Sequence, residues 1–200
     1  MPLEQPGTKI AWHVLKRFFD LFWSSLGMIF LILVFPFIAL AIKLETKGPI
    51  LYTQERMGRY GKVFRVYKFR SMVEDAEIDQ ALWAQKDDPR ITRAGKVLRK
   101  THLDEFPQFW NILKGEMSVV GPRPERPEFI TELAEEIPFY RVRLAAKPGM
   151  AGWGLIHQGD GASKEDALEK LQYDLYYIKH QSLWLDMYIL WRTVLDSLSL

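Results

Sequence analysis

Two adjacent carboxylates in a basic stretch of the chain, Asp104 and Glu105, are the residues best suited to chemistry. Arg99 and Lys100 precede the pair, and an arginine between two prolines, Arg123, follows it. An ionised carboxylate can ligate Mg²⁺ or attack phosphorus, and nearby cations stabilise the charge on a transferred phosphoryl group. The pattern therefore indicates chemistry on a phosphate ester, with Asp104 and Glu105 as candidate catalytic residues.

The same pair is also typical of an ordinary helix start. We expect Asp104 to cap a helix that has Pro107 in its first turn and ends at Gly115. Adjacent side chains diverge by about 100° inside a helix, but the irregular backbone of a helix start can direct both into one cavity. The pair alone leaves the structural and the catalytic interpretation open.

Several cations strengthen the catalytic interpretation. Arg123 has little backbone freedom between its two prolines, and a planar guanidinium matches the oxygens of a phosphate. The apolar run 117–120 before it predicts a buried element that delivers a rigid loop. Each cation is alternatively a solvated surface residue, which is the usual environment of Lys and Arg. The candidate phosphate-binding residues are Lys68, Arg70, Arg99, Pro122, Arg123 and Pro124.

A membrane segment is predicted upstream, because the run from Leu21 to Ile42 contains no charged residue and is long enough to span the hydrocarbon core. Cations flank both ends, with Arg17 before the run and Lys43 after it, whereas the positive-inside rule places such residues on the cytoplasmic side. Pro36 removes one backbone donor inside the run and bends a helix. We predict a re-entrant helix kinked at Pro36, with both ends cytoplasmic. A tilted single span and a buried helix of a soluble protein are the alternatives.

The rest of the chain predicts an α+β fold, a mainly helical small domain with short strands. We expect an N-terminal segment with the membrane hairpin at 1–46 and a membrane-associated catalytic domain at 47–200. The final helix, apolar and aromatic, suits either the core or the headgroup zone of a membrane. The expected strands are Ile50–Thr53 and Val63–Phe69, and the expected helices include Thr92–Arg99, Pro127–Ile137, Lys164–Lys179 and Trp184–Leu195.

Composition excludes several classes of protein. The chain has no cysteine, which rules out a disulfide scaffold, a thiolate zinc site and a cysteine nucleophile. Its four histidines show no metal-ligand spacing. The formal net charge is only +2, so no nucleic acid is expected as a partner.

Taken together, the motifs resemble those of the bacterial sugar transferase family, the monotopic polyprenol-phosphate phosphoglycosyl transferases. The resemblance runs from about Lys16 to Leu195, and the stretch Pro124–Arg143 is most similar to members that initiate exopolysaccharide or O-antigen synthesis. We expect this chain to correspond to the catalytic core, without the extra N-terminal helices of larger relatives. The motifs are Arg56-Met57-Gly58-Arg59, Tyr67-Lys68-Phe69-Arg70-Ser71-Met72, Leu103-Asp104-Glu105-Phe106-Pro107-Gln108, Lys114-Gly115-Glu116-Met117-Ser118, Gly121-Pro122-Arg123-Pro124, Lys147-Pro148-Gly149 and Tyr173-Asp174-Leu175-Tyr176-Tyr177.

The resemblance implies transfer of a phosphosugar from a UDP-sugar to polyprenol (undecaprenyl) phosphate, with release of UMP. Asp104 would be the nucleophile of a ping-pong reaction and the protein ligand of Mg²⁺. Glu105 would act as a base or as a second metal ligand. The protein would lie at the cytoplasmic face of the bacterial inner membrane, in contact with the lipid bilayer. A homodimer and contacts with downstream glycosyltransferases are further expectations.

Two departures from the family pattern are visible. The family often has Ser-Pro at the helix break, where this chain has Phe35-Pro36. After its Pro-Gly it often has an Ala-Gln-Val-Asn sequence, where this chain has Gly152-Trp153-Gly154-Leu155-Ile156-His157, a segment that we expect to form a loop. The second departure leaves an inactive membrane-anchored scaffold as an alternative function. A membrane-anchored protein that binds anionic ligands is another.

Overall fold

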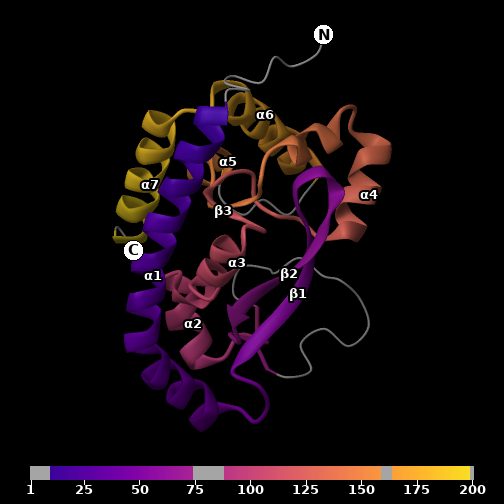
Figure 1. The fold of residues 1–200 in the computed structure, drawn as a ribbon. Helices are drawn as coiled ribbons and strands as arrows, with labels where there is room; N and C mark the ends of the chain where they lie inside the picture. Colours follow the sequence, from indigo (N-terminus) through magenta and orange to yellow (C-terminus); the bar gives the residue numbers. More distant parts are fainter. Residues whose placement is uncertain (1–9, 74–87, 159–163, 199–200) are drawn as a thin grey trace.

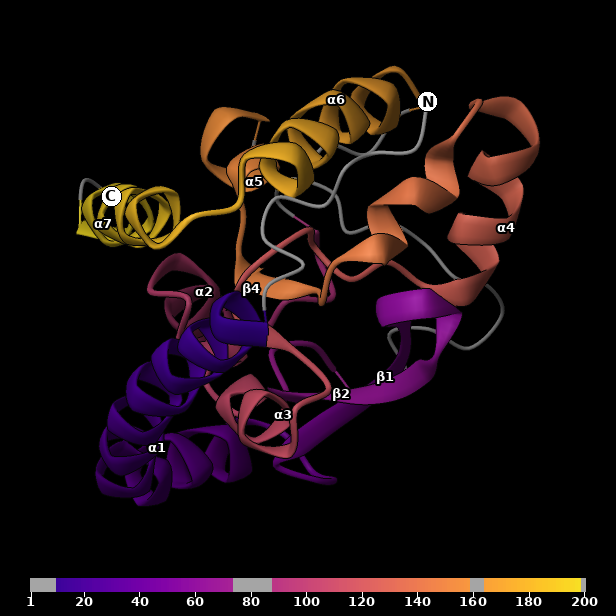
Figure 2. The same ribbon diagram turned by 45° about the horizontal axis from the view of Figure 1, so that its top comes forward.

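The computed structural model describes residues 10–73, 88–158 and 164–198, and Figures 1 and 2 show them as ribbons. Most of these residues are helical, with a few short strands, as the sequence predicted. The elements are α1 (Ile10–Glu45), β1 (Leu51–Met57), η1 (Arg59–Gly61), β2 (Val63–Phe69), α2 (Arg93–Lys100), η2 (Leu103–Glu105), α3 (Gln108–Lys114), β3 (Ser118–Val120), α4 (Pro127–Glu136), η3 (Tyr140–Ala145), β4 (Gly149–Ala151), α5 (Trp153–Gln158), α6 (Lys164–His180) and α7 (Leu183–Leu198).

Helix α1 is 36 residues long, contains Pro36, and lies along one side of the molecule (Figure 1). It is long and apolar enough to cross a membrane: its most apolar 18 residues have a mean hydropathy of 2.7, and only 11% of that stretch is buried. Leu31, Ile38 and Ile42 face the protein, whereas Phe37 on the opposite face is 74% exposed. Such a large exposed apolar surface is typical of a segment that contacts lipid. The predicted long apolar helix is confirmed.

Two strand pairs position the loops of the domain. β1 and β2 form an antiparallel hairpin whose register runs from Leu51↔Phe69 to Met57↔Val63, so the first strand is longer than predicted. β3 and β4 are parallel, with Val120 opposite Ala151. Because parallel strands end at the same edge, the segment after β3 begins beside the segment after β4. The buried element predicted at 117–120 is confirmed, since all three residues of β3 are buried.

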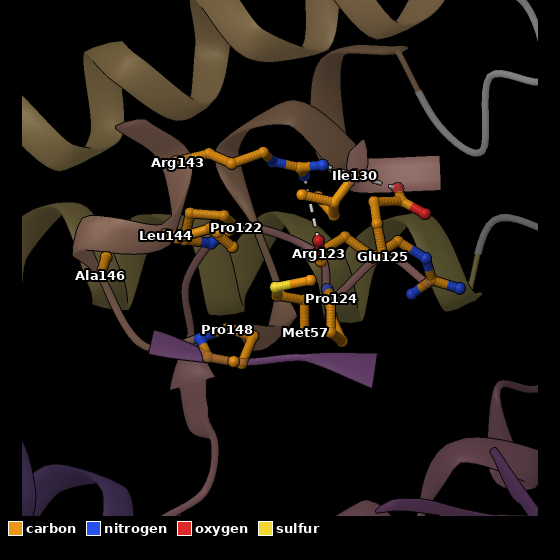
Figure 3. Close-up of a pocket in the computed structure, with 11 residues that line it drawn as sticks. Met57, Pro122, Arg123, Pro124, Glu125, Ile130, Arg143, Leu144, Ala146 and Pro148 are labelled. Carbon is orange, nitrogen blue, oxygen red and sulfur yellow. Dashed lines mark hydrogen bonds and ion pairs between the residues drawn. The ribbon is translucent and has the colours of Figure 1, made fainter. Parts of the chain in front are cut away.

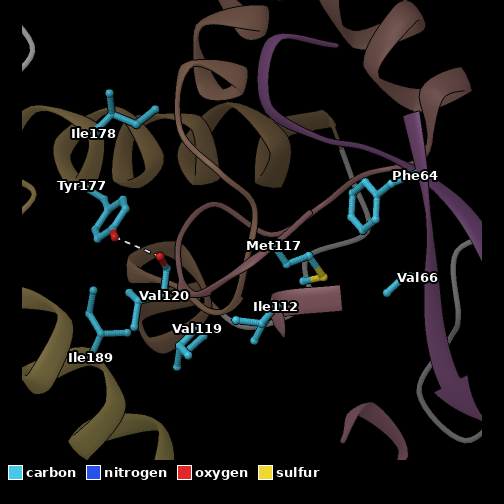
Figure 4. Close-up of a cluster of buried hydrophobic side chains, with 10 residues drawn as sticks. Phe64, Val66, Ile112, Met117, Val119, Val120, Tyr177, Ile178 and Ile189 are labelled. Atoms are coloured by element: carbon cyan, nitrogen blue, oxygen red, sulfur yellow. Dashed lines mark hydrogen bonds between the residues drawn. The ribbon is translucent and has the colours of Figure 1, made fainter. Parts of the chain in front are cut away.

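The largest buried apolar cluster surrounds β3. Side chains of β2, α3, α6 and α7 belong to the same cluster as Val119 and Val120 (Figure 4). Ile112, Met117 and Ile189 are fully buried in this cluster. The strand that leads into the Pro-Arg-Pro segment is therefore fixed on all sides by close packing.

A buried polar network fastens α1 to this core. Lys16 Nζ donates to the Asp186 carboxylate at 2.6 Å and to the carbonyl of Val120 at 3.1 Å. The Tyr177 hydroxyl lies 2.9 Å from Oδ1 of Asp186 and 3.0 Å from the same carbonyl oxygen. We call Lys16, Asp186 and Tyr177 the anchor network. It joins α1, α6 and α7 at the end of β3.

Asp20, one turn after Lys16, binds the beginning of β3. Its Oδ1 accepts hydrogen bonds from the hydroxyl of Ser118 at 2.8 Å and from the backbone N–H of Val119 at 3.0 Å. A buried carboxylate needs such partners, because an unpaired buried charge is strongly destabilising. The first turns of α1, which precede its apolar run, are thus bonded to β3.

Helix α7 is buried on one face and exposed on the other, so its expected place in the core is confirmed for the inner face only. Asp186 and Ile189 are fully buried, whereas Trp184 is 87% exposed and Tyr188 and Trp191 are also exposed. The inner face belongs to the core. The outer face carries the exposed aromatic side chains, and Lys16 joins α7 to the first turns of α1 through Asp186.

The segment after β4 differs from expectation. We expected a loop up to His157, but the structure has a helix there, α5 (Trp153–Gln158). The His157 ring stacks on that of Tyr173 at 4.9 Å, so α5 is held against α6. Ring packing between the two helices explains the difference.

Gly27 gives a test of how α1 packs on α3. A Cβ at this position would overlap the ring of Phe109, which itself packs in the largest cluster. Glycine to alanine in a helix interior normally stabilises by about 1 kcal/mol. We expect Gly27→Ala instead to lower the unfolding temperature in detergent, while Ser25→Ala on the exposed face does not. An increase in unfolding temperature for Gly27→Ala would contradict this packing.

Candidate active site

The acidic pair lies in a short 3₁₀ turn between α2 and α3. Asp104 and Glu105 belong to η2, and α3 begins later, with Pro107 at its N-cap. The prediction that Asp104 caps this helix is therefore wrong. Backbone bonds from Glu105 to His102 and from Phe106 to Leu103 form an extra turn before the helix.

Both carboxylates are buried, but among the described residues only Glu105 accepts side-chain hydrogen bonds. Asp104 is 7% exposed and Glu105 is 9% exposed. Glu105 Oε1 accepts from Lys68 Nζ at 2.6 Å and from Arg123 Nη2 at 3.0 Å. Within the described residues the Asp104 side chain accepts no hydrogen bond. Two neighbouring acids therefore occupy different electrostatic environments.

These environments shift the pKa values of the two carboxyl groups in opposite directions. Burial alone would raise the pKa of Glu105, but Arg123 and Lys68 outweigh it and hold that pKa well below its usual range. Burial, and next the negative charge of Glu105, raise the pKa of Asp104 to about 6, against the opposing effect of nearby cations. Glu105 is therefore ionised at neutral pH, whereas Asp104 gains or loses its proton near pH 6.

The structure brings four of the predicted charged residues around Asp104. Lys68, Arg99 and Arg123 all lower its pKa through their positive charge, and Glu105 adjoins it. Arg99 is held in place by a bond from Nε to the hydroxyl of Ser71 at 2.9 Å. The cations needed for phosphoryl chemistry are thus gathered at one position in the fold.

Arg70 is directed elsewhere. Its guanidinium donates to the carbonyl of Lys47 at 2.7 Å and to the carbonyl and hydroxyl of Thr46 at 3.2 and 2.7 Å. These groups follow the C-terminal end of α1, where a cation also complements the helix dipole. In this structure Arg70 fastens the end of α1, and its phosphate-binding role stays a prediction.

Each carbonyl of the segment 122–125 accepts a hydrogen bond from a different part of the chain. The prolines at 122 and 124 have no N–H groups, so these carbonyls carry much of the backbone bonding. The segment is therefore fixed from several sides, and so is the start of the Arg123 side chain. The bonds run from Gly149 N to Pro122 at 2.9 Å, Arg143 Nη2 to Arg123 at 3.0 Å, Arg56 Nη1 to Pro124 at 3.1 Å and Met57 N to Glu125 at 2.8 Å.

Sequence reasoning missed two residues that orient α3. Arg17 of α1 donates to the carbonyls of Ile112 and Leu113 at 2.6 and 2.7 Å, and so completes the C-terminal end of α3. Asn111 donates to the carbonyl of Arg65 in β2 at 2.7 Å. The sequence signal for Asn111 was a polar residue at a buried helical position. No sequence pattern pointed to Arg17.

The site fits a metal that is shared with substrate. No group of three or more His, Asp or Glu side chains suited to a metal occurs among the described residues. Mg²⁺ usually binds through one or two carboxylates together with substrate phosphates. Asp104 is the free carboxylate here, whereas Glu105 is already paired, so Asp104 fits as the protein ligand.

Comparison with known families places the chain. Residues 11–199 match the family described as bacterial sugar transferase, and the chain belongs to that family. It is 41% identical over 192 residues to the exopolysaccharide production protein PSS of Rhizobium leguminosarum bv. phaseoli, covering 93% of this chain and 96% of that protein.

Two longer relatives have names that state a reaction. One is the UDP-N-acetylgalactosamine-undecaprenyl-phosphate N-acetylgalactosaminephosphotransferase of Aeromonas hydrophila, 47% identical over 156 residues, which are 78% of this chain and 37% of that protein. The other is the UDP-glucose:undecaprenyl-phosphate glucose-1-phosphate transferase of Escherichia coli (strain K12), 39% identical over 184 residues, 91% of this chain and 40% of that protein. The chain thus spans well under half of each of these two.

The raised pKa of Asp104 predicts a pH-dependent stability. Its folded-state value of about 6 lies above the ordinary 3.8, so its ionisation destabilises the fold as the pH rises through 6. We expect Asp104→Asn to raise the free energy of unfolding by on the order of 2 kcal/mol at pH 8 and to have little effect near pH 4. Unfolding in detergent at several pH values measures this, with the exposed Asp196→Asn as control. A gain that is equal at both pH values would contradict the assignment.

Proposed function

We propose that this protein transfers a phosphosugar from a UDP-sugar to polyprenol (undecaprenyl) phosphate. UMP leaves, and a polyprenol-diphosphate sugar forms as the first membrane step of exopolysaccharide or O-antigen synthesis. The observation that carries the proposal is the buried, uncommitted carboxylate of Asp104 beside a Glu105 that is fully paired with Lys68 and Arg123. Membership of the family and the names of the relatives support the same reaction.

The reaction has two displacements at one phosphorus atom. An oxygen of Asp104 attacks the phosphorus that carries the sugar, the bond to the oxygen bridging the two phosphates breaks, and UMP leaves with that oxygen. An oxygen of polyprenol phosphate then attacks the same phosphorus. The bond to Asp104 breaks, and the ionised carboxylate is restored. This sequence is a ping-pong mechanism with a covalent intermediate.

Charge around the pair supports these steps. Arg123, Lys68 and Arg99 stabilise the negative charge that spreads over the phosphoryl oxygens. Glu105 holds the first two of these cations, and its negative charge raises the pKa and hence the basicity of Asp104. Mg²⁺, held by Asp104 and the donor diphosphate, would supply additional neutralisation of phosphate charge.

The proposed location is the cytoplasmic face of the bacterial inner membrane, with α1 as a re-entrant helix kinked at Pro36. Both ends of α1 contact the same domain, which favours a helix that returns over one that spans. Lys16 near the first end binds Asp186 of α7, and Glu45 at the other end accepts from the N–H of Ala94 in α2 at 2.7 Å. The aromatic outer face of α7 suits the headgroup zone beside it.

The alternatives are an inactive scaffold and an anchored protein that binds anionic ligands. Either accounts for the exposed apolar helix and the cations. Neither gives a reason for a free buried carboxylate next to a paired one, since an unpaired buried acid is costly to maintain.

Enzymatic activity is tested by UMP release from a panel of UDP-sugars with Mg²⁺ and undecaprenyl phosphate. We expect release with one donor, none for Asp104→Asn because the nucleophile is lost, and a trace for Glu105→Gln, which keeps the nucleophile but loosens the cations. The exposed Glu128→Gln is the control and should match the unmodified protein. Equal residual activity for the two site variants would refute the assigned roles, and no release with any donor would favour a scaffold.

The topology of α1 is tested with single cysteines, which is simple because the chain has none of its own. His13→Cys and Lys62→Cys place thiols at exposed positions on either side of the apolar run. In membrane vesicles of known orientation, a membrane-impermeant thiol reagent should label both from the cytoplasmic side. Labelling from opposite sides would show a spanning helix.

A further inference from the structure

A buried ion pair lies behind the segment that carries Arg123. Arg143 of η3 and Asp174 of α6 are 3% and 2% exposed. Arg143 binds Oδ2 of Asp174 through Nε at 3.0 Å and through Nη2 at 2.8 Å. The two residues are remote from each other in sequence and join separate elements of the fold.

The same guanidinium reaches three further groups. Nη1 donates to the hydroxyl of Tyr140 at 2.8 Å and lies 3.9 Å from Oε1 of Glu125. Nη2 donates to the backbone carbonyl of Arg123 at 3.0 Å, and Figure 3 shows the contacts with Arg123 and Glu125. Only a planar fork with several fixed donors can make all these bonds at once, and a lysine in this position cannot. Arg143 thus links α6 and η3 to the backbone of one particular site residue.

Four hydrogen bonds hold the segment 122–125, and the bond from Arg143 is the one that reaches the carbonyl of Arg123 itself. The small pocket between Arg143 and the hairpin is lined by apolar side chains such as Met57 and Leu144 together with the charged residues Arg123, Glu125 and Arg143, and has room only for an occupant the size of water (Figure 3). Loss of the Arg143 bond would therefore replace a fixed side-chain donor to the Arg123 carbonyl by water, and the carbonyl would be held less rigidly.

We propose that Arg143, held by Asp174, is a positioning residue that sets the Arg123 guanidinium against Glu105 and the transferred phosphoryl group. This inference rests on the proposed phosphosugar transfer for its functional meaning. It acts through the backbone: Arg143 fixes the carbonyl of Arg123, the two prolines restrict the neighbouring torsions, and the side chain leaves the backbone in one direction. A shift of about 1 Å in a group that stabilises a transition state is enough to lower the rate by about 100-fold.

The kinetic test compares Arg143→Lys with Arg141→Lys, an exposed position on the same short helix. For Arg143→Lys we expect kcat to fall by about 10- to 100-fold while the KM for the donor changes by less than about threefold, because Arg123 acts in the transition state. Tyr140→Phe removes one bond to the same guanidinium, should fold readily, and should show a smaller fall in kcat. A rise in KM with unchanged kcat would overturn the proposal.

A double-mutant cycle separates positioning from general destabilisation. If Arg143 acts through Arg123, then Arg143→Lys should cause little further loss of kcat/KM in an Arg123→Ala background. Losses that multiply would mean that Arg143 acts independently of Arg123, and the proposal would be wrong.

Hydrogen exchange gives a readout that does not require activity. The peptide covering 119–126 should exchange faster in Arg143→Lys than in the unmodified protein, and Arg141→Lys should not change it. Unchanged exchange would overturn the positioning inference whether or not the protein transfers phosphosugars. Faster exchange in the variant, together with an unmodified protein that is inactive towards every donor, would uphold the structural link and contradict the proposed function instead.

Discussion

The buried contact of Lys16 with Asp186 and the Val120 carbonyl is the interaction on which the rest of this structure depends. A helix that exposes most of its apolar surface must still be joined rigidly to a polar site, and apolar packing on one narrow face leaves that joint weak. The anchor network places a charged bond at the end of β3, immediately before the segment that contains Arg123. Breaking a buried pair of this kind typically costs 3–5 kcal/mol, because the remaining charge is left uncompensated. The placement of α1 and the geometry of the site are therefore coupled through one strand.

From that strand outward, the site is assembled by bonds to backbone carbonyls. Arg17 fixes the end of α3, Arg70 fixes the end of α1, and Arg143 fixes the Arg123 carbonyl. Arginine suits this task because its fork satisfies several acceptors while its charge remains. The consequence is a pair of neighbouring carboxylates in different electrostatic environments. Glu105 is ionised and bonded to two cations, whereas the Asp104 side chain accepts no hydrogen bond from the described residues. Many cations in this chain thus serve architecture, and a smaller set faces the acidic pair.

Much of the architecture could be predicted from the sequence, because it follows from local patterns. The apolar periodicity of α6, the alternation in β2 and the stop at Gly115 each depend on nearby residues. The 3₁₀ turn at Asp104 could not be predicted. It depends on a bond from the N–H of Glu105 to the carbonyl of His102, and the same residues are equally typical of a simple helix start. The position of Arg70 was also hidden, since only the folded arrangement brings the end of α1 beside β2. For the same reason no sequence pattern connected Arg143 with Asp174, although the second lay in a recognised motif.

The central claim is that Asp104 carries the phosphosugar, and intact-mass spectrometry tests it most directly. The purified protein would be mixed with Mg²⁺ and the UDP-sugar that supports turnover, without polyprenol phosphate. We expect a mass increase of one phosphosugar, located at Asp104 by peptide mapping and lost when the acceptor is added. Turnover that depends on the acceptor, with no adduct at Asp104 under any of these conditions, would contradict it.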